Sequence, residues 1–325
     1  MGEVKQNSFK AWILAARPKT LTGAVAPVFV GWALALFYFN RIEPDQGVLN
    51  WTNAIICLLF ALLMQIDANF INDYFDFKKG SDTKERLGPE RACAQGWITL
   101  KAMRLGIFLI TLLAVLVGVP LIIQKEWWLV IVGLACVIGA FLYTTHLSYR
   151  GWGDVMVLFF FGLIPVFFTQ WVTLNTTLAN SRNLPYIISV ILAGAAMGFV
   201  TDNLLVVNNY RDREQDAQNG KKTIIVRLGV RAGERLYLFN GILGIVLAIA
   251  AEALLAVNYG GYFWPIALVL LFLPLLITSY RRMVKIKSGK ALNFSLGEAA
   301  RNILIFSVFL VSSITLLFFS FEDLL

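Results

Sequence analysis

The sequence contains one polar pattern twice, and each copy follows an apolar stretch. The two copies are Asn72-Asp73-Tyr74-Phe75-Asp76 and Asn208-Asn209-Tyr210-Arg211-Asp212. Each continues into a polar segment with a glycine, basic residues and a further aspartate, which is Asp82 in the first copy and Asp216 in the second. Because residues four positions apart share one face of a helix, each copy is predicted to present a short stripe of amide and carboxylate oxygens. Since Gly80 is expected to end the first helix, Asp82 must return to its site from a loop.

Several carboxylates directed at one place repel one another and take up protons unless a cation holds them. Mg²⁺ prefers hard oxygen ligands, commonly one or two carboxylates with substrate phosphates and water. The neighbouring lysines and arginines suit the phosphate or diphosphate that accompanies such a metal. Solvated or paired charges at helix ends are the alternative interpretation, and the in-register repetition of the motif favours the metal site. The candidate metal ligands are Asn72, Asp76, Asp82, Asn208, Asp212 and Asp216.

The composition identifies a membrane protein, because 58% of the 325 residues are hydrophobic and only 15% are charged. Apolar runs long enough to span a bilayer predict nine transmembrane helices and an all-α polytopic fold over residues 1–325. The predicted spans lie at roughly 22–39, 53–71, 105–123, 127–145, 155–174, 184–207, 236–257, 262–280 and 302–320.

The basic residues support this number of spans, since cytoplasmic loops collect Lys and Arg. With the N-terminus inside, all of the 28 lysines and arginines except Arg41, Lys125 and Arg182 fall in inner segments. Both motifs then face the cytoplasm. The net charge of +8 reflects this topology and some attraction to anionic lipid headgroups, so it requires no nucleic-acid partner.

The motifs end the second and sixth predicted spans, which indicates two pseudo-repeats at about 10–150 and 151–300, followed by a ninth helix at about 302–320. Paired acidic motifs and basic residues at the lipid edge fit an amphiphile with a diphosphate head. If the tail is a polyprenyl chain, Mg²⁺ and the basic residues would neutralise the departing diphosphate. An electron-rich acceptor would then attack the allylic cation in a dry, aromatic cavity.

Three stretches of the chain resemble the UbiA superfamily of intramembrane prenyltransferases, and within it the branch that acts on 1,4-dihydroxy-2-naphthoate. The stretches are Arg17-Pro18-Lys19-Thr20-Leu21 with Ala26-Pro27-Val28, Asn72 to Arg91, and Val207 to Gly229. The resemblance implies nine transmembrane helices in two four-helix repeats plus one. It also implies Mg²⁺-dependent transfer of a polyprenyl group from its diphosphate to dihydroxynaphthoate, with loss of CO₂, giving demethylmenaquinone.

The resemblance also implies roles for individual residues. The six candidate ligands would bind Mg²⁺–diphosphate, and Lys79, Arg91 and Lys222 would help to hold the phosphates. Arg17 and Lys19 would meet the carboxylate of the acceptor. A multi-pass protein of the bacterial inner membrane is expected, with its active site facing the cytoplasm.

One departure from the branch leaves alternatives open. Where Tyr-Thr-Gly-Gly-Pro is expected, this chain has Tyr143-Thr144-Thr145-His146. If that loop lines the acceptor pocket, 4-hydroxybenzoate or homogentisate are alternative acceptors. A cation-coupled transporter is the alternative of another class, because paired acidic motifs in repeated helices can bind ions at a repeat interface. Motifs at the inner ends of their spans, rather than at the bilayer midplane, favour the enzyme.

Overall fold

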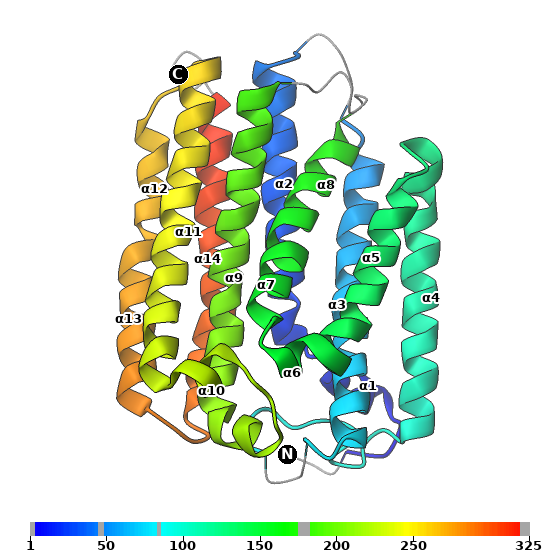
Figure 1. Ribbon diagram of the computed structural model, residues 1–325. Helices are drawn as coiled ribbons and strands as arrows, with labels where there is room; N and C mark the ends of the chain where they lie inside the picture. The colour runs from blue at the N-terminus through cyan, green and yellow to red at the C-terminus, as the bar shows by residue number, and fades with distance from the viewer. Residues whose placement is uncertain (1–3, 45–48, 83–85, 175–182, 319–325) are drawn as a thin grey trace.

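The computed structural model of the protein describes residues 4–44, 49–82, 86–174 and 183–318. Within these ranges all regular secondary structure is helical, and nine helices are long and apolar enough to cross a membrane. Figure 1 shows these helices running along one common direction, with the longer connections at the two ends. The predicted all-α polytopic architecture is confirmed, whereas its division into two pseudo-repeats stays a prediction.

Six of the spans in the described ranges are single α-helices. They are α2 (Thr22–Arg41), α3 (Trp51–Lys78), α4 (Leu100–Gln124), α9 (Leu184–Gln218), α11 (Val230–Tyr259) and α14 (Leu292–Phe318). The fourth, fifth and eighth spans are composite. They comprise α5 (Leu129–Leu142), η2 (Tyr143–Leu147) and α6 (Ser148–Arg150); α7 (Gly153–Leu158), η3 (Phe159–Leu163) and α8 (Ile164–Thr173); and η4 (Trp264–Ile266), α12 (Ala267–Leu270) and α13 (Phe272–Ile286). Short helices α1 (Phe9–Ala16) and α10 (Ile224–Leu228) lie outside the spans.

Two helices extend well beyond the apolar runs that predict them. The second span was expected to end near residue 71 and the sixth near residue 207, but α3 continues to Lys78 and α9 to Gln218. Both polar motifs therefore lie inside helices. The apolar pattern stops earlier than the helix because the last turns present polar side chains to other parts of the protein instead of to lipid. The last span likewise begins at Leu292, ahead of the predicted residue 302.

Helix α9 lies centrally and packs against α11, α14 and the α7–η3 segment. Small residues permit the closest of these approaches. A Cβ atom added at Gly162 of η3 would lie 2.4 Å from the carbonyl oxygen of Gly194 and 2.6 Å from the Cα of Gly198. In lipid, where apolar surface alone drives little association, such close backbone packing is a main source of helix–helix attraction. This contact fixes the position of α7 relative to α9.

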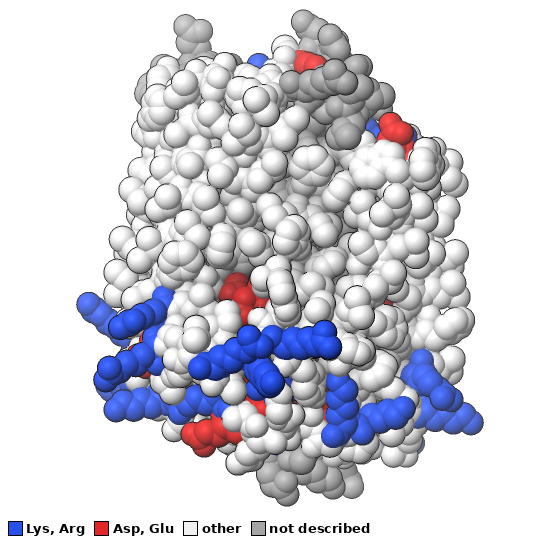
Figure 2. All heavy atoms as spheres, viewed as in Figure 1, with Lys and Arg blue, Asp and Glu red and all other residues white. Residues whose placement is uncertain are grey.

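Lys and Arg side chains gather at one end of the molecule in the view of Figure 2, around α6, α10 and the N-terminal end of the chain. The surface above this band is almost free of charged side chains in the same view. The C-terminal ends of α3 and α9, which carry both polar motifs, lie at the charged end (Figure 1). The charge distribution therefore agrees with the predicted alternation of basic and apolar segments.

We expect Gly162→Leu to destabilise the protein, because no side chain fits between η3 and α9. Overpacking of this kind costs about 1–3 kcal/mol or more. Gly133→Leu on α5 is the matched control, since a Cβ at Gly133 meets nothing within 4 Å. Thermal unfolding in detergent would report the difference, and equal melting temperatures for the two variants would contradict the packing argument.

Candidate functional site

A cavity of about 480 Å³ opens between the helices and extends from the polar motifs into the apolar body of the bundle. Residues of α3, α5, α7, α8 and α9 contribute to its walls. Its charged end brings together side chains from distant parts of the chain. All six predicted metal ligands line it: Asn72, Asp76, Asp82, Asn208, Asp212 and Asp216.

The first motif reaches the cavity from α3 and from the turn that follows it. Asn72 and Asp76 lie one helical turn apart on α3, and the hydroxyl of Thr144 donates a hydrogen bond to the Asn72 side chain. Gly80 adopts a positive φ of 77°, which a residue with a side chain rarely adopts. The backbone N–H groups of Ser81 and Asp82 then donate to the carbonyl oxygen of Asp76 at 2.9 and 3.3 Å. This reversal returns Asp82 to the cavity, as the sequence predicts.

Asp73, the remaining acid of the first motif, has a different role. Its buried carboxylate accepts hydrogen bonds from the backbone N–H groups of Ala92 and Cys93 at 2.8 and 2.9 Å. It thereby anchors the loop that carries Arg86 and Arg91 to α3. The first motif therefore supplies both cavity oxygens and the attachment of the cationic loop.

The second motif lies entirely on α9, which places Asn208, Asp212 and Asp216 on one wall of the cavity. The intervening Arg211 is only 2% exposed. Its guanidinium group donates to Asn208 at 3.0 Å and to both Asp212 oxygens at 2.7 Å. It also donates to Asn293 at the start of α14 at 2.9 Å. Arg211 therefore orients the second motif and attaches it to the last span.

Two cations connect the motifs across the cavity. Arg86 forms ion pairs with Asp82 of the first motif and, at 3.4 Å, with Asp212 of the second. Lys221 lies 3.7 Å from Asp216 and also experiences the charge of Asp76. Burial by itself would lower the pKa of Lys221, but these carboxylates outweigh burial and raise the pKa above its ordinary value. The two motifs therefore form one electrostatic unit.

Only some of the cations predicted to hold substrate line the cavity. Arg17 and Arg91 line the cavity. Lys19 and Lys222 are exposed and do not line it, and Lys79 donates to the carbonyl oxygen of Thr145 at 2.9 Å. The Lys79 ammonium group also lies 4.0 Å from the centre of the Tyr149 ring.

Sequence reasoning did not select Arg86 or Lys221, although both line the cavity. Each follows its motif at a similar distance along the chain, with Arg86 after Asp76 and Lys221 after Asp212. This similar sequence separation could have identified both residues as candidate phosphate-binding cations from the sequence alone. Choosing Lys221 over the adjacent Lys222 required the structure, because the two residues differ only in the direction of their side chains.

The amide and carboxylate oxygens of the two motifs, together with the basic side chains beside them, suit a diphosphate accompanied by Mg²⁺. In the described ranges no three acidic, histidine or cysteine side chains form a complete metal cluster, and Asp82, Asp212 and Asp216 form ion pairs with basic side chains instead. Among the residues that the structure describes, no hydrogen-bond partner is found for the buried nitrogens Arg86 Nε and Arg91 Nη1, which is how donors for an anionic ligand are disposed. Burial raises the pKa of Asp82 above its ordinary value, although Arg86 opposes this, so a cation at Asp82 would relieve an unfavourable charge.

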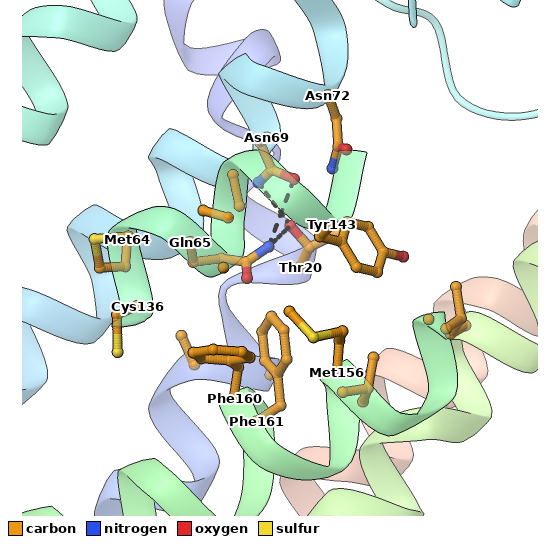
Figure 3. Close-up of a pocket in the computed structure, with 18 of the residues that line it drawn as sticks. Thr20, Met64, Gln65, Asn69, Asn72, Cys136, Tyr143, Met156, Phe160 and Phe161 are labelled. Atoms are coloured by element: carbon orange, nitrogen blue, oxygen red, sulfur yellow. Dashed lines mark hydrogen bonds between the residues drawn. The ribbon is translucent and has the colours of Figure 1, made fainter. Parts of the chain in front are cut away.

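Beyond the charged end, the cavity becomes largely apolar but keeps one polar cluster. Gln65 donates to the Thr20 hydroxyl at 3.4 Å, and Asn69 donates to the same hydroxyl at 3.1 Å. Figure 3 shows Phe160 and Phe161 across the cavity from these amides. The remaining walls come from α3, α4, α5 and α8. They include Phe60, Met64, Leu121, Ile122, Val137 and Phe168.

A cavity with a cationic and carboxylate-rich end and a long apolar body accommodates an amphiphile with a phosphorylated head. The fold and the site therefore define a membrane protein with a cavity suited to a lipid-like phosphate ester.

The chain belongs to the UbiA prenyltransferase family, whose model matches residues 24–304. The 1,4-dihydroxy-2-naphthoate octaprenyltransferase of Haemophilus influenzae is 34% identical over 82% of this chain and 84% of that protein. The Escherichia coli protein of the same name is 31% identical over 97% of this chain and 98% of its own length. Membership of a family of enzymes favours catalysis over the transporter alternative.

Solved structures support the fold. A UbiA homologue from Archaeoglobus fulgidus, bound to DMAPP and Mg²⁺, superposes with a TM-score of 0.54 at 14% identity, and the match covers 93% of this chain and 99% of that one. A digeranylgeranylglyceryl phosphate synthase gives a TM-score of 0.53 at 18% identity, over 94% and 99% of the two chains. The arrangement of helices is therefore shared across the family at low identity.

We expect Lys221→Met to lower kcat/KM for the prenyl diphosphate by about 10–100-fold, the loss typical of removing a charge-assisted contact. The neighbouring Lys222→Met should remain near wild type, because Lys222 is exposed and outside the cavity. Steady-state prenyl transfer at varied diphosphate concentration measures both. A larger loss for Lys222→Met than for Lys221→Met would show that the lysine assignment is reversed.

Proposed function

We propose that the protein transfers a polyprenyl group from polyprenyl diphosphate to 1,4-dihydroxy-2-naphthoate with loss of CO₂ and diphosphate, giving the hydroquinone form of demethylmenaquinone in menaquinone biosynthesis. The observation that carries this proposal is the similarity to dihydroxynaphthoate octaprenyltransferases along most of the chain. The cavity supports it, since both acidic motifs line one space that continues into an apolar channel.

At the charged end, the amides and carboxylates of both motifs would hold Mg²⁺ and with it the diphosphate. When bound, Mg²⁺ neutralises the negative charge that develops on the departing diphosphate. Arg86, Arg91 and Lys221 contact the phosphate oxygens, because they are the cavity cations nearest the motifs. Their charges act most strongly on the leaving group in this partly buried site, where solvent screening is weak.

The apolar body of the cavity protects the reactive prenyl group. Phe160 and Phe161 line the wall opposite Gln65 (Figure 3), so aromatic faces are available beside the allylic carbon. Aromatic faces stabilise a cation without capturing it, and exclusion of water prevents hydrolysis. The prenyl tail extends along the apolar walls away from the motifs.

The acceptor carboxylate is placed by Arg17. Its guanidinium group lines the cavity and donates to the Asn69 side chain and backbone at 3.3 Å each. Asn69 is held in turn by Thr20, so the guanidinium orientation is fixed from α3. Lys19 lies outside the cavity lining, and we assign the carboxylate contact to Arg17 alone.

We further propose a location in the inner membrane of a bacterial cell, with the charged end and the active site facing the cytoplasm. Nine apolar spans in the described ranges support a multi-pass protein. The concentration of Lys and Arg at the motif end supports this orientation.

Product analysis tests the reaction. Purified protein with one polyprenyl diphosphate and Mg²⁺ is offered 1,4-dihydroxy-2-naphthoate, 4-hydroxybenzoate or homogentisate, and the products are identified by mass spectrometry. We expect a decarboxylated prenyl product from dihydroxynaphthoate, with EDTA stopping the reaction and Mg²⁺ restoring it. A preference for either other acceptor would reassign the substrate, and prenylation that persists in EDTA would overturn the metal-dependent mechanism.

We expect Asp76→Ala and Asp212→Ala each to reduce turnover by about 10³-fold or more, because each removes a carboxylate from the site that holds the leaving group. Correct folding is verified by thermal unfolding, and turnover is measured with saturating dihydroxynaphthoate. Activity within tenfold of wild type in either folded variant would refute the shared diphosphate site.

A further inference from the structure

A second acidic pair lies beside the cavity, away from the two motifs. Asp154, in the first turn of α7, lines the cavity. Its carboxyl group interacts electrostatically with that of Asp202 of α9, which is 3% exposed. The side chain of Asn240 on α11 donates to the Asp202 Oδ2 atom at 2.7 Å. Asp154 of α7 is therefore linked to α9 through Asp202 and, through Asp202, to Asn240 of α11.

Two neighbouring buried carboxyl groups do not readily carry a negative charge at the same time, because the charges repel strongly. Asp202 is enclosed by protein and is not part of the cavity lining, whereas Asp154 reaches the cavity surface. A negative charge is therefore less costly on Asp154 than on the enclosed Asp202. Asp154 presents a carboxylate oxygen to whatever occupies the cavity.

An independent feature indicates a polar ligand at this level. Thr201 is 4% exposed and lines the cavity, and its hydroxyl has no hydrogen-bond partner within the described ranges. On α3, the Gln65 Oε1 atom also lines the cavity, is buried and has no partner in the described part of the chain. Buried polar atoms normally find partners, so these atoms are disposed to meet polar groups of a ligand.

The depth of these groups matches an aromatic acceptor placed next to the diphosphate. Asp202 precedes Asn208 on α9, and Gln65 precedes Asn72 on α3, by six and seven residues. At 1.5 Å per residue both lie roughly 10 Å along their helices from the motifs. The polar groups of the two walls therefore lie at a similar level, about the length of a bicyclic ring from the metal ligands.

We propose that Asp154 is the general base that accepts a proton from a ring hydroxyl of the acceptor, with Asp202 and Asn240 as positioning residues. This inference rests on the proposed function. The hydroxyl O–H bond breaks, its proton passes to Asp154, and the ring becomes a stronger carbon nucleophile. The ring carbon forms a bond to C1 of the prenyl group while the C1–O bond breaks, and that electron pair leaves with diphosphate. Loss of CO₂ returns an electron pair to the ring, and the ring oxygen recovers the proton from Asp154.

The first test compares Asp154→Asn, Asp154→Glu and Asp67→Asn. Asp67 is a matched control because it is another buried span carboxylate, accepts a hydrogen bond from Thr111 at 2.7 Å, and lies outside the cavity lining. We expect Asp154→Asn to lower kcat at least 100-fold, Asp154→Glu to retain a tenth or more, and Asp67→Asn to remain within threefold of wild type. Mg²⁺-dependent thermal stabilisation by the prenyl diphosphate should persist in all three.

A second readout separates a base from a structural residue. At higher pH more of the acceptor is ionised in solution, so the residual rate of Asp154→Asn should rise about tenfold per pH unit while the wild type changes little. Within the described ranges, Asp202 and Tyr143 are the titratable groups in electrostatic contact with Asp154. Asp202→Asn should therefore lower kcat about tenfold and shift the pH profile, without changing the KM for the prenyl diphosphate.

Several outcomes would overturn the assignment. Turnover of Asp154→Asn within threefold of wild type would exclude a base at this position. Loss of stabilisation by the prenyl diphosphate in this variant would assign Asp154 to the diphosphate site instead. Should Asp154→Asn fail to fold, a folded but inactive Asp154→Glu would count against the proposal and an active one would support it. Failure of the proposed function is distinguishable, because the wild-type protein would then form no dihydroxynaphthoate product.

Discussion

Electrostatic repulsion among carboxylates from two distant parts of the chain is the constraint that organises this protein. Asp76 and Asp82 belong to α3 and its following turn, and Asp212 and Asp216 belong to α9. They share one cavity because basic side chains lie between them, above all Arg86 and Lys221. Under the proposed function, these internal ion pairs would be replaced by contacts to a magnesium-bound diphosphate, which carries both kinds of charge.

The apolar walls of the surrounding helices make the cavity suitable for an amphiphile whose head binds at the charged end. Polar groups are costly in the apolar interior of a membrane, and the charged side chains of both motifs gather at one end of the cavity. The Asp73 carboxylate anchors the cationic loop through the backbone of Ala92 and Cys93, and Arg211 attaches the second motif to Asn293. Asp73 and Arg211, which are not proposed to touch the substrate, therefore position the side chains that are.

The composite spans bear on the proposed chemistry. The fourth and fifth spans contain π-helical turns at Tyr143–Leu147 and Phe159–Leu163. Such turns rotate the following side chains relative to an uninterrupted α-helix and are frequent at functional sites. The first contains Thr144, which contacts Asn72, and the second contains the phenylalanines of the cavity wall. The segment that departs from the expected Tyr-Thr-Gly-Gly-Pro sequence is therefore still close to the site.

By itself, the sequence determined the all-α membrane class, the number of spans and the six oxygen-bearing residues of the motifs. These properties follow from local hydrophobicity and from spacing within one helix, which need no knowledge of distant contacts. Tertiary structure decided which cations enter the cavity. It selected Arg86 and Lys221 and left Lys19 and Lys222 outside, because side-chain direction depends on how the turns after α3 and α9 fold back. It also paired Asp154 with Asp202, since contact between α7 and α9 arises only from packing across the bundle.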